Sequence, residues 1–329
     1  MGQVARGMEN VEKKVRSGER LDREDGLALL ASDDLAGLGG LAHHVRTLKS
    51  GDTACFAVRR TVDVTDPDGA VRDATEAVAA GAVELELPAA AELPWEHHAQ
   101  VLGALRRQVP DTVALHAFTV ADVLRFAEQG TPAEAVLDAL TAAGPASLTA
   151  RPAAGPEPSW EEWARVQRLA HRRGLTTPCT LPYGHTEEPA DLVDHLLRLR
   201  ELQDETGGFR VLLPLRHPGP RGATGAEILK TFAVARLMLD NVPHVAVDWA
   251  LHGAQTAQLA LQHGADEMAG RVVEGDEERD ADALFREDLV DLIRDAGFRP
   301  VERDARYGAL RTYEGPDPDR RESPQPMRV

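Results

Sequence analysis

The sequence predicts an α/β fold in the form of a (β/α)8 barrel of the TIM type. Short runs rich in β-branched residues, each followed by an amphipathic helical run, repeat from residue 51 to about residue 296. Eight such units can be distinguished, and eight is the number that closes a barrel. The main alternative is an open doubly wound sheet, but no predicted strand is followed by a GxGxxG or GxxxxGK[ST] pattern.

The predicted strands are short runs bounded by turn-forming residues. They cover residues 54–58, 82–87, 112–118, 146–149, 176–181, 209–215, 244–249 and 265–268. The predicted helices between them have apolar residues at helical spacing. They cover residues 70–80, 95–108, 120–143 with a break at 130–132, 160–173, 189–205, 225–241, 253–263 and 284–296.

Segments of different character flank the barrel, which is expected to comprise residues 51–296. Residues 1–50 are predicted to be an N-terminal helical extension, in which Asp22 and Ser32 are expected to be the N-caps of two helices. Residues 297–329 are predicted to form a short hairpin, because apolar and polar residues alternate there, followed by a Pro-rich tail.

The formal net charge is −17, from 37 Lys and Arg against 54 Asp and Glu. This excess of negative charge repels phosphate groups, and no basic run with interleaved aromatic residues is present. We therefore expect neither nucleic acid nor a membrane surface as a partner. No run of eighteen residues lacks a charge and the first twenty residues have no apolar core, so a cytoplasmic protein is expected.

In a (β/α)8 barrel the site lies at the carboxyl ends of the strands, so polar residues near those ends are the candidates. They are Arg60, His116, Tyr183, His185, Glu187, Arg216, Asp248, His252 and Gln255. Together, the histidines and carboxylates could bind a divalent metal or perform acid–base chemistry. Taken singly, each also has an ordinary structural explanation. Glu187 suits the start of a helix, and a carboxylate in a strand, such as Asp248, must either face the cavity or pair with an arginine such as Arg216. Tyr183 and His185 are expected to face the barrel mouth.

The chain has only two cysteines, Cys55 and Cys179. They fall in the first and fifth predicted strands, which lie on opposite sides of a barrel, and no CxxC motif is present. We therefore expect two buried free thiols and no disulfide.

Several long runs closely resemble the aminofutalosine synthases of the radical SAM superfamily, and the resemblance extends nearly from end to end. The most specific runs are residues 160–163 (WEEW), 196–209 (LLRLRELQDETGGF), 223–237 (ATGAEILKTFAVARL), 255–266 (QTAQLALQHGAD) and 288–303 (DLVDLIRDAGFRPVER). The resemblance implies a radical SAM barrel in which a CxxxCxxC loop after the first strand holds a [4Fe-4S] cluster. Cleavage of S-adenosylmethionine then gives an adenosyl radical, which adds to 3-[(1-carboxyvinyl)oxy]benzoate in the futalosine route to menaquinone.

The sequence departs from this family pattern where the cysteine loop should follow the first strand. Residues 61–76 contain no cysteine, and residues 66–69 (DPDG) favour a tight turn. Other segments on the same side of the barrel are also shorter than, or unlike, those of the family, namely residues 149–158, 217–222 and 273–282. We therefore expect a retained scaffold whose mouth loops have been pruned.

Three functions remain open. The first is a cluster-free paralogue that needs no cofactor and is inactive, or binds a small molecule or an intact paralogue. The second is an active aminodeoxyfutalosine synthase with cluster ligands from elsewhere. The third is a repurposed enzyme that uses a metal or acid–base set drawn from His116, His185, Glu187, Asp248 and His252.

Overall fold

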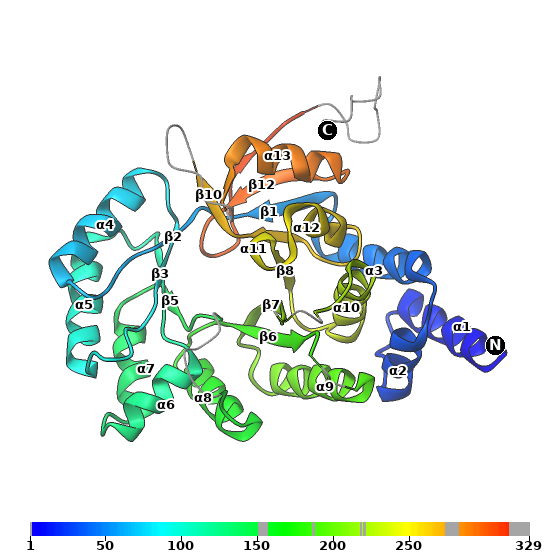
Figure 1. Cartoon of the computed structure of the whole chain (residues 1–329), viewed down its shortest axis with the longest axis horizontal. Helices are drawn as coiled ribbons and strands as arrows, with labels where there is room; N and C mark the ends of the chain where they lie inside the picture. The colour runs from blue at the N-terminus through cyan, green and yellow to red at the C-terminus, as the bar shows by residue number, and fades with distance from the viewer. Residues whose placement is uncertain are drawn as a thin grey trace.

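The computed structural model describes residues 2–150, 157–185, 188–217, 219, 222–273 and 283–315. Strands and helices alternate along the chain, as Figure 1 shows. The strands that build the barrel are β1 (Thr53–Phe56), β2 (Arg59–Thr61), β3 (Glu84–Leu87), β4 (Ala114–Ala117), β5 (Ala146–Ser147), β6 (Thr177–Tyr183), β7 (Phe209–Arg216), β8 (His244–Asp248) and β9 (Glu267–Ala269).

All pairings among these strands are parallel, in two ladders with the orders β5-β4-β3-β2 and β1-β9-β8-β7-β6. The first barrel strand is split, so that Cys55 in β1 pairs with Glu267 of β9 and Arg59 in β2 pairs with Glu84 of β3. The eighth unit therefore lies beside the first, which is the strand order of a (β/α)8 barrel and confirms the predicted fold class. Within the described residues, no ladder joins β5 to β6.

The helices follow the strands and cover the outside of the barrel (Figure 1). They are α4 (Pro67–Ala79), α5 (Trp95–Gln108), α6 (Val120–Glu128), α7 (Ala133–Ala142), α8 (Trp160–Arg172), α9 (Pro189–Thr206), α10 (Gly225–Met238), α11 (Trp249–His252), α12 (Ala254–Leu261) and α13 (Arg286–Asp295). The predicted break at residues 130–132 is confirmed, because α7 begins after Pro132.

The connection from β2 to α4 is short. Asp66 caps α4 by accepting hydrogen bonds from Asp68 N and Gly69 N, and Pro67 is the first helical residue. Only residues 62–66 therefore separate β2 from α4. The DPDG sequence forms the start of a helix, which leaves no extended loop at this position.

Three helices precede the barrel: α1 (Gly2–Ser17), α2 (Arg23–Ala31) and α3 (Leu35–Ser50). Asp22 forms the predicted N-cap of α2, in a capping box with Asp25. The predicted role of Ser32 is wrong, because Asp34 caps α3 by accepting from Gly37 N, whereas Ser32 ends α2. Both residue types suit an N-cap, and the sequence did not distinguish two sites so close together.

The apolar core has two parts. One joins β2–β5 to α4–α8 and includes Leu85, Leu115 and Phe126. The other joins β6–β9 to α9–α13 and also takes in the N-terminal helices through residues such as Leu38. Figure 1 shows the two halves on opposite sides of the barrel, with α1–α3 beside the second.

The predicted C-terminal hairpin is confirmed as β12 (Arg299–Arg303) and β13 (Ala309–Thr312), which pair antiparallel. The sequence did not predict that β12 also pairs in parallel with β1, from Thr53 opposite Arg299 to Phe56 opposite Glu302. A further short parallel pair, β10 (Arg271–Val273) with β11 (Ala283–Phe285), follows the last barrel strand. The hairpin therefore extends the barrel sheet, and its turn reaches the amino-terminal end of the strands.

Candidate binding site in the barrel lumen

A cavity of about 1180 Å³ runs through the barrel. Inward-facing polar residues of β2, β3, β4, β8 and β9 contribute to its wall. They include Arg59, Thr61, Glu84, Glu86, His116, Asp248 and Glu267. Leu213 and Leu215 of β7 supply apolar wall on the facing side. A cavity of this size with a few convergent polar groups is the kind of site that takes a small molecule.

Buried ion pairs organise the wall near the start of β3. The Glu84 carboxylate accepts from Arg59 (Nη2 to Oε2, 2.6 Å) and from Arg303 (Nη1 to Oε1, 2.6 Å). Arg303 also donates to Glu267 Oε1 at 2.5 Å. Burial by itself raises the pKa of Glu84, but the charges of Arg303 and Arg59 outweigh it and hold that pKa well below the usual range. Glu84 is therefore ionised, and the ion pairs link β2, β3, β9 and β12.

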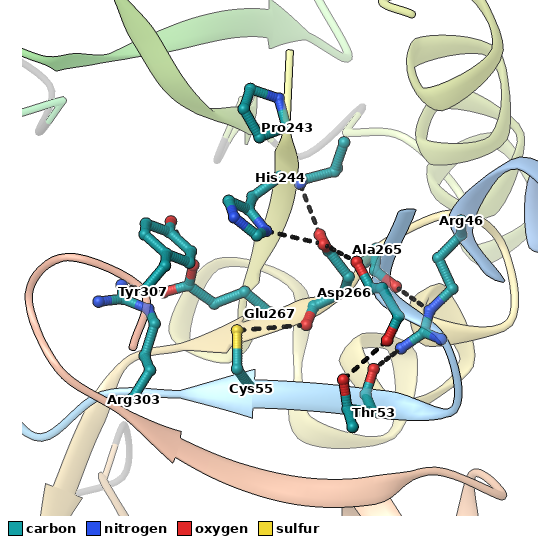
Figure 2. Close-up of polar contacts among 12 residues, drawn as sticks. Arg46, Thr53, Cys55, Pro243, His244, Ala265, Asp266, Glu267, Arg303 and Tyr307 are labelled. Atoms are coloured by element: carbon teal, nitrogen blue, oxygen red, sulfur yellow. Dashed lines mark hydrogen bonds and ion pairs between the residues drawn. The ribbon is translucent and has the colours of Figure 1, made fainter. Parts of the chain in front are cut away.

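The turn between β12 and β13, residues 304–308, lies under one side of the barrel and is called the basal turn below. Its Tyr307 hydroxyl donates to Glu267 Oε2 at 2.6 Å, and the Tyr307 ring stacks on His244 with centroids 3.8 Å apart. Figure 2 shows Tyr307 and Arg303 beside Glu267, with His244 above. The hairpin was predicted from the sequence, but the contribution of its turn to the cavity wall was not. The usable signal was that Glu84 and Glu267 stand in predicted buried strands and so require cationic partners.

Asp266 anchors a second polar cluster beside the first. It accepts hydrogen bonds from Ser50 Oγ (2.6 Å), Arg236 Nη2 (2.8 Å), His244 Nδ1 (2.9 Å) and Val245 N (2.7 Å). Asp266 directly precedes β9, which begins at Glu267. Both residues therefore lie at the amino-terminal end of the barrel. The contacts of Asp266 tie α3, α10 and β8 together.

Three of the predicted site residues line the cavity. Arg60 donates through Nη1 to Val272 O, which ties β2 to β10. His116 Nε2 is buried without a hydrogen-bond partner among the described residues and lies 3.7 Å from Glu84 Oε2. Asp248 caps α11 by accepting from Ala250 N at 2.8 Å, and burial raises its pKa.

Tyr183, His252 and Arg216 do not line the cavity. In β6 every second residue is buried, which places Tyr183 with Cys179 and Leu181 in the core. The Tyr183 hydroxyl lies 2.9 Å from His252 Nε2, and His252 Nδ1 donates to Asp248 O at 2.8 Å. The expectation that Tyr183 faces the mouth is wrong, because the strand turns this residue towards the helices.

The remaining candidates are also separate from the cavity. The His185 ring lies against His217, with ring centroids 3.9 Å apart and the ring planes tilted by 42°, and Gln255 is exposed on α12. Glu187 lies outside the described residues. The expected pair of Asp248 with Arg216 is not formed. Within the described ranges, no group of three or more His, Cys, Asp or Glu residues is arranged to hold a metal ion.

The two thiols do not fit the cluster that the resemblance implies. Cys55 Sγ lies 3.5 Å from Asp266 O and Cys179 Sγ lies 3.6 Å from Val211 O, on β1 and β6 respectively. Burial raises the pKa of both thiols. A [4Fe-4S] cluster takes three or four thiolates, and two cannot supply them. The CxxxCxxC motif is also longer than the 62–66 connection that follows β2.

None of the helices in the described part of the chain combines the length and the apolar content that crossing a bilayer requires.

Comparison with solved structures supports the fold. HydG, the maturase of the [FeFe]-hydrogenase, covers 92% of this chain with a TM-score of 0.66 at 13% sequence identity, and the match covers 77% of the HydG chain. Methylornithine synthase (PylB) covers 89% of this chain with a TM-score of 0.61 at 16% identity, over 97% of its own chain. At these identities the likeness concerns the fold, and both proteins share the barrel described above.

Comparison of sequences gives the family. Residues 214–315 match the family described as the CofH/MqnC C-terminal region. The aminodeoxyfutalosine synthase of Streptomyces coelicolor is 49% identical over 97% of this chain and 98% of its own length. The enzyme of the same name from Thermus thermophilus is 32% identical over 92% of this chain and 96% of its own length. The chain therefore belongs to the aminodeoxyfutalosine synthase family.

Proposed function

We propose that this protein is a cluster-free member of the aminodeoxyfutalosine synthase family, which keeps the barrel and its lumen to bind a small molecule and does not cleave S-adenosylmethionine. The number of thiols carries the proposal. The chain has two cysteines, the half-buried Cys55 and the buried Cys179, both held in strands, and the connection after β2 has room for no cysteine loop. Without three thiolates from this chain, the cluster that starts the family's radical chemistry is not assembled.

The length of the alignment supports a loss of segments. The alignment with the Streptomyces coelicolor relative spans 380 positions, whereas 97% of the 329 residues here is about 319. About 60 positions of that relative therefore have no counterpart in this chain. The aligned remainder is still 49% identical, which indicates that the missing positions are concentrated in loops rather than in the scaffold. The loops are where a barrel builds its site.

The intact lumen supports ligand binding over a purely vestigial fold. The Arg59–Glu84–Arg303–Glu267 ion pairs are complete and buried, and such pairs tolerate the loss of one member poorly. The wall of the cavity is therefore a defined polar surface. A complex with an intact paralogue is the other role proposed for a cluster-free chain, and co-purification with such a synthase tests it.

One observation favours an active synthase as the second candidate function. The identity of 49% extends over 97% of the chain, which includes the scaffold helices and the strands. In that case the cluster ligands would have to come from outside this chain, and the reaction would be the transfer of an adenosyl group from S-adenosylmethionine to 3-[(1-carboxyvinyl)oxy]benzoate.

Anaerobic reconstitution with iron and sulfide distinguishes the two. The purified chain, its Cys55→Ala/Cys179→Ala double variant and the Streptomyces coelicolor relative are treated in parallel, and iron and 5′-deoxyadenosine are then measured. We expect the chain to hold no more iron than the double variant and to form no 5′-deoxyadenosine, while the relative does both. About four irons per chain, lost in the double variant and accompanied by 5′-deoxyadenosine, would overturn the proposal.

A further inference from the structure

The cavity reaches the surface at the amino-terminal end of the barrel. Several of its lining residues are exposed and come just before a strand or lie in the basal turn. They are Thr141 and Gly144 before β5, Gly174 and Thr176 before β6, Arg210 at the start of β7, and Arg306 in the basal turn. Because all of these positions belong to the amino-terminal end, this opening is opposite to the loops that carry the active site in a (β/α)8 barrel. The cavity also has exposed lining residues at the carboxyl end, namely Thr61, Ala250 and Arg271, so the amino-terminal opening is one of two. We call it the basal mouth.

The barrel is interrupted beside this opening. β5 and β6 end the two ladders and are not paired within the described residues. The cavity wall includes residues 144–150 on one side of this interruption and residues 174–178 on the other, so the cavity extends between the two strands. Arg303 of β12 and Tyr307 of the basal turn cover the side of β3, β8 and β9 and leave the side of β5, β6 and β7 uncovered.

The lining carries the opposite charge to the whole protein. The described residues that line the cavity include six arginines (Arg59, Arg60, Arg210, Arg271, Arg303 and Arg306) and four carboxylates (Glu84, Glu86, Asp248 and Glu267). The formal charges of these ten side chains sum to +2, whereas the net charge of the whole chain is −17. A cleft of one sign with low-dielectric walls focuses its field and concentrates ligands of the opposite sign.

Unused hydrogen-bond donors mark the path from the basal mouth into the lumen. The guanidinium groups of Arg210 and Arg306, both exposed at the rim, make no hydrogen bond or ion pair with described residues. Further in, the Arg303 side chain is only 3% exposed, and its Nε has no hydrogen-bond acceptor among the described residues. Arg106, Arg216 and Arg294 also have a buried Nε without an acceptor among the described residues, but of these four arginines Arg303 is the one that lines the cavity, where a ligand or water can meet it.

We propose that small anionic molecules enter the lumen through the basal mouth between β5 and β6, attracted by Arg210 and Arg306 and received inside by Arg303. The carboxylates Glu84 and Glu267 do not oppose this, because Arg59, Arg303 and Tyr307 already bind them. The inference concerns the route and the sign of the ligand. It holds whether or not the protein carries a cluster, so its test is independent of the reconstitution experiment.

A cysteine placed in the lumen tests the route. Ala114 on β4 lines the cavity and is 6% exposed, so the Ala114→Cys variant puts a thiol there; Ala246→Cys on β8 is the second choice if the first variant does not fold. The thiolate attacks a methanethiosulfonate reagent, a mixed disulfide forms and methanesulfinate leaves. The rates with the anionic ethylsulfonate reagent and with the cationic trimethylammonium reagent are each divided by that reagent's rate with free cysteine. The ratio of the two normalised rates cancels the pKa of the introduced thiol.

We expect the normalised rate to be about tenfold or more higher for the anionic reagent than for the cationic one. The Arg210→Glu/Arg306→Glu double variant should lose this preference, whereas Arg107→Glu, an exposed charge reversal on α5 away from the cavity, should keep it.

Thr176→Trp at the basal mouth should slow both reagents, and Leu251→Trp at the other end of the lumen should slow neither. Faster reaction with the cationic reagent, no reaction of either lumen cysteine, or slowing by Leu251→Trp in place of Thr176→Trp would each overturn the proposal. Intact wild-type protein measures the background from Cys55 and Cys179.

Discussion

Arg303 on β12 donates to the Glu84 carboxylate on β3 across 2.6 Å, although the two residues are 219 positions apart in the chain. Arg303 also binds Glu267 of β9, so one guanidinium bridges two buried carboxylates from different strands, and Arg59 supplies the second positive charge at Glu84. The C-terminal hairpin is thereby fixed to the barrel, and its turn becomes part of the cavity wall. The stability of the barrel and the shape of its lumen consequently depend on a residue close to the end of the described chain.

The Arg303→Met variant should be strongly destabilised. Methionine keeps most of the side-chain volume but leaves Glu84 and Glu267 without their shared cation, and breaking a buried ion pair in this way costs about 3–5 kcal/mol. Unfolding in urea, followed by circular dichroism, measures the free energy of unfolding. Arg311→Met on the exposed strand β13 is the matched control and should change that free energy by less than about 0.5 kcal/mol. Equal effects of the two substitutions would contradict the role given to Arg303.

Protonation of Asp266 should lower the stability of the protein in acid. Burial raises its pKa, but the charge of Arg236 and the hydrogen bonds from His244 and Ser50 together outweigh burial, so that its pKa lies below the usual value of 3.8. Because the pKa is lower in the folded state than in the unfolded state, the contribution of Asp266 is complete above about pH 4 and is lost as the pH falls further. Between about pH 6 and pH 3 the loss should be on the order of 1 kcal/mol.

The measurement is the urea midpoint between about pH 6 and pH 3. Asp266→Asn lowers stability at every pH, because Arg236 loses its partner, but it should flatten the pH dependence below about pH 4. The exposed Glu201→Gln variant should retain the wild-type slope. An unchanged slope in Asp266→Asn would show that other carboxylates account for the acid sensitivity.

Local signals explain how much of the fold could be predicted. The order of strands and helices follows from apolar spacing, and the break before α7 follows from Pro132, which cannot continue a helix. The place of β12 beside β1 could not be predicted, because a strand pair depends on residues far apart, and nothing near Arg299 indicates Thr53 as its partner. The division of the first strand into β1 and β2 has the same cause, since β9 and β3 each pair with one part of it.

The site was predicted less well, because the strand ends do not decide which way a side chain points. A shift of one residue turns a side chain from the lumen to the helix layer. His116 and Asp248 line the lumen as expected, whereas Tyr183 lies in the core. Arg303 and Tyr307 are not among the predicted site residues, because a (β/α)8 barrel points to the carboxyl ends of its strands and these two residues lie at the other end.

Replacement of Tyr183 by phenylalanine tests whether this residue lies in the core rather than in the lumen. The variant loses a buried hydrogen bond to His252 and leaves His252 Nε2 without its partner, which should cost about 1–3 kcal/mol of stability. Because Tyr183 does not line the cavity, the reaction of a lumen cysteine with the anionic reagent should be unchanged in the folded variant. Loss of that reaction at a pH and temperature where the variant is folded would place Tyr183 in the lumen after all.

Cys55 should report on the basal turn. It lies on β1 opposite Glu267, close to Arg303 and Tyr307, as Figure 2 shows, whereas Cys179 lies in the core of β6. Burial raises the pKa of both thiols, so the native protein should react slowly with Ellman's reagent, and both thiols should react once guanidinium chloride unfolds it.

Weakening the basal turn by Arg303→Met should expose Cys55 before Cys179, because local opening takes less free energy than global unfolding. The expected result is an increase of at least about tenfold in the rate of Cys55 labelling, located by mass spectrometry of tryptic peptides, with no change at Cys179; tenfold corresponds to an opening easier by about 1.4 kcal/mol. If the two cysteines are labelled together, the turn opens only when the whole barrel unfolds, and the hairpin is then an integral part of the cooperative core.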